Sequence, residues 1–184
     1  MNPQDFEYLK DFLKTRSGIV LSADKLYLVE SRLTPVAREL GMSGIDELID
    51  TLRKTVDESL KTKITDAMTT NESFFFRDQS PFDNLRDHVL PSMVAARKAK
   101  GQNRIRIWSA ACSSGQEPYT IAMMLLENKA KFGDMSFEIL ATDLSTEIVD
   151  KAKEGAYSQF EVQRGLPIQL LVKYFTQTDT AWQI

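Results

Sequence analysis

The stretch RIRIWSAACSSGQEP, residues 104–118, decides the fold. Its first half alternates apolar and polar side chains as a β-strand does, and the chain then turns at Gly115 into a helix. A second strand is predicted at 137–142, followed by Asp143 and a helix capped by Ser145. Strand, helix, strand and helix at this spacing predict parallel strands in a doubly wound α/β sheet.

Upstream of residue 70 the apolar residues recur at helical spacing, which predicts a small bundle of four or five short helices. The first is expected to stop at Gly18, where glycine accepts a left-handed conformation. The other starts are predicted from caps: Ser22, Thr34-Pro35, and the pairs Ser43 with Asp46 and Thr55 with Glu58. We therefore expect an all-α domain over 1–72 and an α/β domain over 73–184.

The α/β part contains few strands. Ser80-Pro81 opens a further amphipathic helix with Phe82, Leu85 and Val89 on its apolar face, and 182–184 alternates like a short strand. Two parallel strands alone do not make a stable open sheet. We therefore expect an incomplete Rossmann-like domain: either the chain is a fragment, or its missing strands come from elsewhere, as in self-association with a second copy.

Composition excludes several classes of function. The 184 residues are 42% hydrophobic and 27% charged, as in globular proteins, and 23 Lys and Arg face 26 Asp and Glu, which disfavours general nucleic-acid binding. One Cys and one His supply neither an intrachain disulfide nor the usual metal ligands, so we expect no metal site. With no signal peptide or membrane-length apolar run, a cytoplasmic location is predicted.

Two features of the α/β part suggest a bound nucleoside. The turn at 113–118 lies between a strand and a helix, where Gly115 lets a ligand approach the backbone and the helix start offers free N–H groups. Asp143, at the carboxyl end of the next strand, is placed to accept hydrogen bonds from ribose hydroxyls. The alternatives are a tight structural turn and a helix-flanking cap.

A third feature precedes the sheet. The segment NESFFFRD, residues 71–78, has three consecutive phenylalanines framed by polar and charged residues, and one ring at least must point away from a helical core stripe. Aromatic and polar groups that converge in this way suggest a binding site. A packed aromatic hinge between two domains is the alternative.

The runs TTNESFFFRD (69–78), WSAACSSGQEPYTIAM (108–123) and ILATDLSTEIVDKAKEGAY (139–157), in this order and spacing, closely resemble the CheR-type chemotaxis receptor methyltransferases. The resemblance extends over essentially the whole chain. It implies transfer of a methyl group from S-adenosylmethionine to glutamate side chains of chemotaxis receptors, which gives S-adenosylhomocysteine. The expected partner is the cytoplasmic domain of such a receptor.

The resemblance also implies roles for residues that match the family's motifs. Asn71, Ser73 and Arg77 resemble its cofactor-contacting segment, with Ser73 in place of the usual Thr. Arg77 is expected to pair with the methionyl carboxylate and so to position the reacting methyl group. Glu117, after the turn at Gly115, would face the cationic end of the cofactor.

Asp143 matches the family's ribose-binding acid. By resemblance, members continue for a further segment with an Asn-Leu adenine contact and a Tyr near the transferred methyl, and this sequence lacks both. The catalytic site is therefore expected to be incomplete. The rival hypothesis is a non-catalytic scaffold built on a truncated methyltransferase fold, and methylation of a small molecule or nucleic acid is a third hypothesis.

The remaining candidates have simpler interpretations. Cys112 is expected to be a small residue near the turn rather than a nucleophile, and His88 a residue of the helix surface. Lys25 and Arg32 are expected to share a helix face that, by resemblance, would meet acidic receptor helices; a solvated face is the alternative. The basic run over 97–106 is interpreted as a solvated loop.

Overall fold

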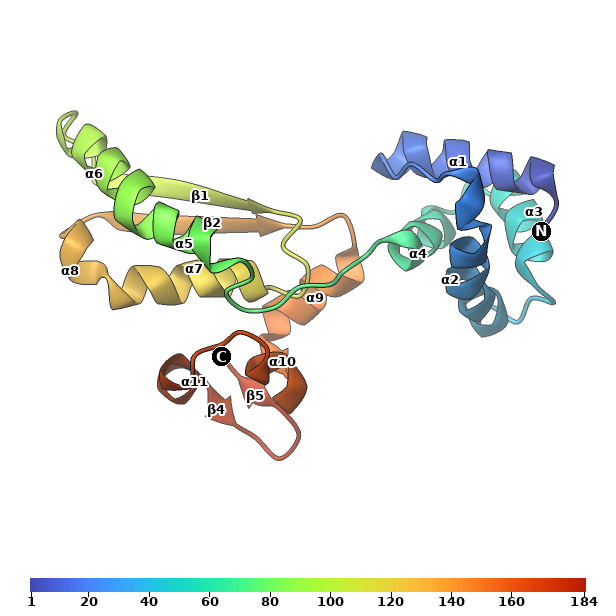
Figure 1. Cartoon of the computed structure of the whole chain (residues 1–184). Helices are drawn as coiled ribbons and strands as arrows, with labels where there is room; N and C mark the ends of the chain where they lie inside the picture. The colour runs from blue at the N-terminus through green and yellow to red at the C-terminus, as the bar shows by residue number, and fades with distance from the viewer. The chain divides into compact units, whose positions relative to one another are not determined.

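The computed structural model describes all residues, 1–184, and divides the chain into two compact units, Met1–Thr70 and Asn71–Ile184 (Figure 1). The division falls close to the boundary that we placed between residues 72 and 73. None of the helices combines the length and the apolar character that a bilayer crossing requires.

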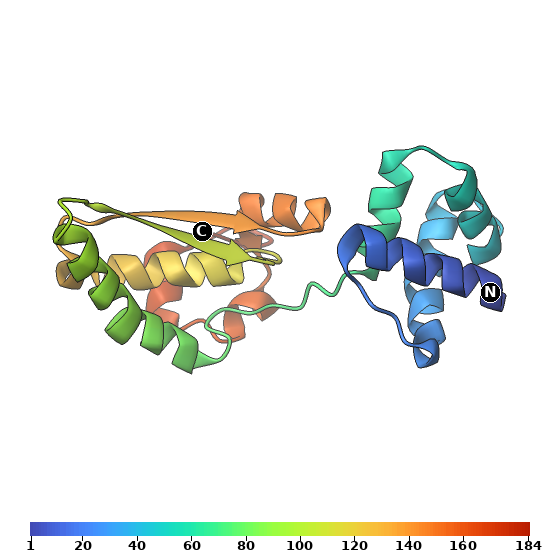
Figure 2. The same ribbon diagram turned by 90° about the horizontal axis from the view of Figure 1, so that it is seen from above.

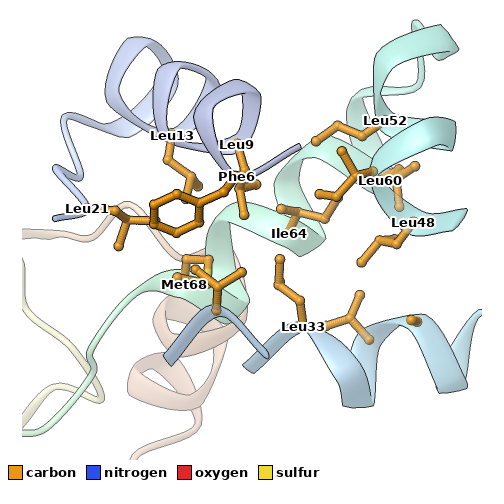
Figure 3. Close-up of a cluster of buried hydrophobic side chains, with 14 residues drawn as sticks. Phe6, Leu9, Leu13, Leu21, Leu33, Leu48, Leu52, Leu60, Ile64 and Met68 are labelled. Atoms are coloured by element: carbon orange, nitrogen blue, oxygen red, sulfur yellow. The ribbon is translucent and has the colours of Figure 1, made fainter. Parts of the chain in front are cut away.

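The first unit is the expected helical bundle. Its α-helices are α1 (Pro3–Ser17), α2 (Leu26–Glu39), α3 (Ile45–Lys54) and α4 (Glu58–Met68), and the short 3₁₀ helix η1 (Ala23–Lys25) precedes α2. Gly18 ends α1 as predicted, with φ 74° and its N–H bonded to the carbonyl of Lys14. Leucine, isoleucine and phenylalanine side chains from all four helices fill the core (Figure 3).

The prediction that Thr34-Pro35 starts a new helix is wrong. Pro35 lies inside α2, and the Thr34 hydroxyl donates back to the carbonyl of Glu30 at 2.6 Å. Proline removes one helical hydrogen bond, but Leu33, Val36 and Ala37 around it are buried in the core. Tertiary packing therefore keeps the helix continuous through the proline.

The two capping boxes predicted in this unit are also wrong. The N-cap of α3 is Gly44, and Ser43 pairs with Glu47 through both its N–H and its hydroxyl. The N-cap of α4 is Asp57, whose carboxylate accepts the N–H of Ser59 at 2.8 Å. At α4 the carboxylate of Asp57, directly before the helix, takes the capping position, and the Thr55 hydroxyl lies two residues further from the helix start.

The second unit is built on the predicted parallel pair. Strands β1 (Arg104–Ala110) and β2 (Ser136–Thr142) pair in register from Arg104 with Ser136 to Ala110 with Thr142. Helix α7 (Gln116–Glu127) runs alongside the two strands, and α6 (Leu90–Lys98) packs beside β1 (Figures 1 and 2). The short helix α8 (Lys129–Phe132) leads into β2, and Ser145 caps α9 (Thr146–Glu154) as predicted.

The helix expected from Ser80-Pro81 contains an irregularity that shifts its apolar face. Helix α5 (Gln79–Asn84) continues through a π-helical turn, η2 (Leu85–Val89), into α6. The wider turn displaces the stripe by one residue, so Leu90 is fully buried whereas Val89 is exposed. The expectation that Val89 faces the core is therefore wrong.

A small antiparallel sheet follows α9, and we predicted only its last strand. It has the order β3 (Ala156–Tyr157), β5 (Trp182–Gln183) and β4 (Thr176–Gln177). Helices α10 (Gln159–Gln163) and α11 (Ile168–Tyr174) connect these strands. Its core is a cluster of buried residues: Phe75, Met123, Tyr157, Val162, Leu166, Leu171 and Phe175.

Candidate functional site

The loop between β1 and α7 has a strained backbone. Ala111, Ser113 and Gly115 all have left-handed conformations, with φ of 58°, 50° and 94°. Residues other than glycine rarely adopt left-handed backbone conformations. Where they do, they are often found at ligand-binding sites. The loop therefore needs restraints from outside itself.

Ser113 supplies two of these restraints and joins the three sequence motifs. Its hydroxyl donates to the carbonyl of Asn71 at 2.7 Å, and its N–H donates to Oδ2 of Asp143 at 2.8 Å. The adjacent Cys112 N–H bonds to the carbonyl of Thr142 at 2.9 Å. The segment at 71, the glycine loop and the end of β2 therefore meet at one buried serine.

Asp143 braces two chain segments at the carboxyl end of β2. Its second oxygen, Oδ1, accepts the N–H of Ser145 at 3.0 Å. The helix-flanking role that we gave as the alternative is thus present, and each carboxylate oxygen keeps a lone pair for a further donor. Beside it lies a cavity of about 390 Å³, lined by Ala141, Thr142, Asp143, Thr146, Val149, Asp150 and Lys153.

Glu117 lies in the first turn of α7, directly after the glycine loop. Its Oε1 accepts the hydroxyl of Ser109 at 2.7 Å, while the residue as a whole is exposed. Ser109 is buried near the end of β1, so this bond fixes the carboxylate beside the strand. A negative charge held at this point can face a cationic group of a ligand.

The three phenylalanines of the segment 74–76 have separate surroundings. Phe75 is fully buried, with its ring edge-on to Tyr157 at 5.0 Å and to Phe175 at 5.6 Å. Phe76 contacts the ring of Phe82, and its N–H donates to the hydroxyl of Thr120 at 3.2 Å. This packing anchors the segment in the second unit.

The third ring, Phe74, lies close to two guanidinium groups. Arg164 lies 4.3 Å and Arg77 5.7 Å from its centroid. Arg77 donates to the carbonyl of Glu72 at 3.1 Å, and Arg164 donates to the carboxylate of Glu72 at 2.7 Å. The bond from Arg164 lowers the pKa of Glu72. Arg77 itself is exposed, with donors available to a ligand.

All six predicted site residues lie in the second unit, where different contacts hold them. Asn71, Gly115 and Asp143 meet through Ser113 and its loop, Glu117 follows in the helix, and Arg77 ends the aromatic segment. The remaining one, Ser73, is half-buried in the same segment. Their contact with a cofactor stays a prediction.

The structure also places the weaker candidates, namely Cys112, His88 and the basic run over 97–106. Cys112 is buried, and burial raises the pKa of its thiol, which suits a packing role rather than a nucleophile. His88 is exposed on the π-helical turn, as expected. The basic run over 97–106 includes Arg104, which pairs with Glu138.

Arg32 does not share a free basic face with Lys25. Its guanidinium donates to the carbonyls of Met68 and Thr69, each at 2.7 Å, and to the Thr70 hydroxyl at 2.9 Å. Because the last carbonyls of a helix lack partners, a guanidinium there satisfies them and complements the helix dipole. Arg32 therefore fixes the end of α4.

Sequence reasoning missed the residues that support the site from outside the motifs. Ser113 was noted only as a feature of the glycine turn, although a polar side chain inside a strained loop is a signal for a loop brace. Thr120, Tyr157 and Arg164 lie far along the chain from the segments they hold. No local pattern predicts such partners.

These features define an all-α domain joined to a Rossmann-like domain of the kind that binds a nucleoside cofactor. Two family models match the chain: one described as the CheR methyltransferase all-alpha domain over residues 4–69, the other as the CheR methyltransferase SAM binding domain over residues 71–184. The chain belongs to the CheR methyltransferase family, whose second domain is named for S-adenosylmethionine.

Curated relatives agree with this assignment. The chain is 43% identical over 174 residues to chemotaxis protein methyltransferase 1 of Pseudomonas aeruginosa, a match that covers 93% of this chain and 62% of the relative. It is 41% identical to chemotaxis protein methyltransferase Cher2 of Pseudomonas putida, with the same coverage. It is 39% identical to a chemotaxis protein methyltransferase of Borreliella burgdorferi, over 91% of this chain and 59% of the relative. The chain thus spans about three fifths of these relatives.

Proposed function

We propose that the protein is an S-adenosylmethionine-dependent O-methyltransferase that esterifies glutamate side chains of chemotaxis receptors. The observation that carries this proposal is the position of Ser113, which bonds both to Asn71 and to Asp143. Three motifs that resemble the family's cofactor-binding segments are thereby tied together at the carboxyl ends of two parallel strands, where α/β folds bind their ligands.

The charges of the proposed site fit the cofactor. The exposed Arg77 guanidinium suits the methionyl carboxylate, and the exposed Glu117 carboxylate suits the ammonium or sulfonium charge. Asp143, beside the cavity at the end of β2, suits the ribose hydroxyls. Asn71, Ser73 and Gly115 are proposed to contact the cofactor beside Arg77, Glu117 and Asp143, through their backbone and small side chains.

The proposed chemistry asks little of the protein beyond positioning. When bound, the cofactor supplies a methyl group on a sulfonium that is already a good leaving group. A glutamate carboxylate is ionised at pH 7, because its ordinary pKa is near 4.3, so no side chain has to remove a proton. The residues of this chain hold the donor at a fixed place, and alignment of this kind contributes up to about 7 to 11 kcal/mol.

The proposed acceptor is the cytoplasmic domain of a methyl-accepting receptor, which would place the protein in the cytoplasm. Its single buried cysteine is compatible with a reducing compartment. Methylation removes one negative charge from each modified glutamate and so shifts a signalling helix pair between its states.

The test is labelled methyl transfer by the full-length protein. With methyl-labelled S-adenosylmethionine and a chemoreceptor cytoplasmic domain, we expect label on the receptor that base releases as methanol, as a carboxyl ester requires. The Arg77→Ala variant is expected to transfer none. A receptor that stays unlabelled would favour a non-catalytic scaffold, and base-stable label would indicate another acceptor.

A further inference from the structure

The glycine loop of the proposed cofactor site is held from a direction that the motifs do not include. The hydroxyl of Tyr157, in the first strand of the antiparallel sheet, donates to the carbonyl of Ser114 at 2.7 Å. Tyr157 is fully buried and Ser114 nearly so, which shields the bond from water. Burial also raises the pKa of Tyr157, so its hydroxyl stays protonated and remains a donor.

This bond acts on a part of the loop where orientation matters. The Ser114 carbonyl and the Gly115 N–H belong to the same planar peptide group, so fixing one fixes the other. The Gly115 N–H in turn donates to the carbonyl of Cys112 at 3.0 Å. A Cβ on Gly115 would lie 3.0 Å from the Tyr157 hydroxyl, so the two residues are in tight contact.

The Tyr157 ring also holds the second half of the proposed site. It packs edge-on against Phe75 at 5.0 Å, within the segment that carries Asn71 and Arg77. Its other neighbours are Phe175 at 6.2 Å and Tyr119 at 6.3 Å. One side chain thus contacts both the glycine loop and the aromatic segment.

We propose that Tyr157 is a positioning residue for the cofactor site, which sets the Ser114–Gly115 peptide through its hydroxyl and the 71–77 segment through its ring. The inference rests on the proposed function, since it concerns the same site. It also links that site to the antiparallel sheet, because β3 pairs with β5 at Tyr157 and Trp182. A ligand or partner that moved this sheet would change cofactor affinity.

The experiment compares two neighbouring tyrosines whose hydroxyls donate to different carbonyls, Tyr157 fully buried and Tyr119 half-buried. Tyr157→Phe keeps the ring and removes the bond to Ser114. The control, Tyr119→Phe, removes a bond of 3.0 Å to the carbonyl of Ala152, in α9. Both variants are compared with the wild-type chain by calorimetric titration with S-adenosylhomocysteine and by thermal unfolding, and exchange of the Gly115 amide is followed by NMR.

We expect Tyr157→Phe to bind about tenfold more weakly, since a buried carbonyl loses its partner, and to exchange its Gly115 amide faster. Tyr119→Phe is expected to lose thermal stability without either change. Equal affinity in wild-type protein and Tyr157→Phe overturns the inference, because a merely structural tyrosine lowers the unfolding temperature alone. A full-length protein that binds no S-adenosylhomocysteine and labels no receptor overturns the proposed function instead. Unchanged Gly115 exchange in Tyr157→Phe then overturns the inference on its own.

Replacing Tyr157 by p-aminophenylalanine supplies a second variant with a donor at the same position. We expect it to restore affinity to within about twofold of wild type, and to remain folded if the Phe variant does not. A folded p-amino variant with weakened binding would show that the hydrogen bond is not what positions the loop.

Discussion

Replacing Gly165 by alanine tests the fit between the loop before α11 and the aromatic segment. A Cβ at Gly165 would lie 2.1 Å from the carbonyl oxygen of Phe75 and 3.2 Å from the ring of Phe74. Since the nearer atom belongs to the backbone, no side-chain rotation relieves the overlap. The residue also has φ 84°, which alanine adopts only with strain.

The magnitude follows from these two terms. The left-handed conformation costs alanine about 1 to 2 kcal/mol, and forcing extra volume into a packed region costs about 1 to 3 kcal/mol. Together they predict a loss of about 2 to 5 kcal/mol. Gly101→Ala is the matched control, because Gly101 has φ 67° and a Cβ there would meet nothing within 4 Å. It should lose about 1 to 2 kcal/mol.

The assay is urea unfolding followed by tryptophan fluorescence. Both tryptophans of the chain, Trp108 and Trp182, lie in the second unit, so the signal reports that unit alone. We expect Gly165→Ala to be clearly less stable than Gly101→Ala. Equal losses in the two variants would refute the steric argument, because only the shared backbone strain would then be acting.

Three further predictions concern single contacts. Ser113→Ala should bind S-adenosylhomocysteine about fivefold more weakly, since losing the bond to Asn71 costs about 1 kcal/mol. The control Ser92→Ala, which loses an exposed bond to His88, should bind as wild type does. Equal affinities of the two variants would contradict this prediction. Cys112 should react with a thiol reagent only on unfolding, and rapid reaction of the native chain would show that it is not buried. The ion pair with Arg164 lowers the pKa of Glu72 in the folded state. The stability that this pair adds is therefore present above the ordinary glutamate pKa and is lost as the pH falls through the lowered value. The difference in urea midpoint between wild type and Glu72→Gln should therefore shrink in acid, and a constant difference would exclude this ion pair as its cause.

Much of the fold could be predicted because the decisive signals are local. The alternation that starts at 104 and the apolar run over 137–142 predicted the two parallel strands. Gly18 marked the end of α1 through its left-handed conformation, and Ser145 marked the start of α9 through its capping side chain. The predictions that failed in the helical unit depended on competition. Several residues near each helix start could serve as a cap, and the residue directly before the helix does so, while packing keeps α2 continuous through Pro35.

The candidate site divides in the same way. Motif residues such as Arg77 and Asp143 could be named from the sequence, whereas the braces that hold them come from distant segments. Tyr157 reaches Ser114 across 43 positions and Arg164 reaches Glu72 across 92. The π-helical turn that exposes Val89 likewise could not be predicted, because the apolar spacing there fits an ordinary α-helix.

The central claim, that the second unit forms a cofactor site, is tested most directly by calorimetric titration of the chain with S-adenosylhomocysteine. We predict saturable one-to-one binding by the wild-type chain and none by Arg77→Ala. The control Arg97→Ala, which loses only an exposed bond to Gln102, should bind as wild type does. A folded wild-type chain that binds nothing, or an Arg77→Ala variant with unchanged affinity, would contradict the claim.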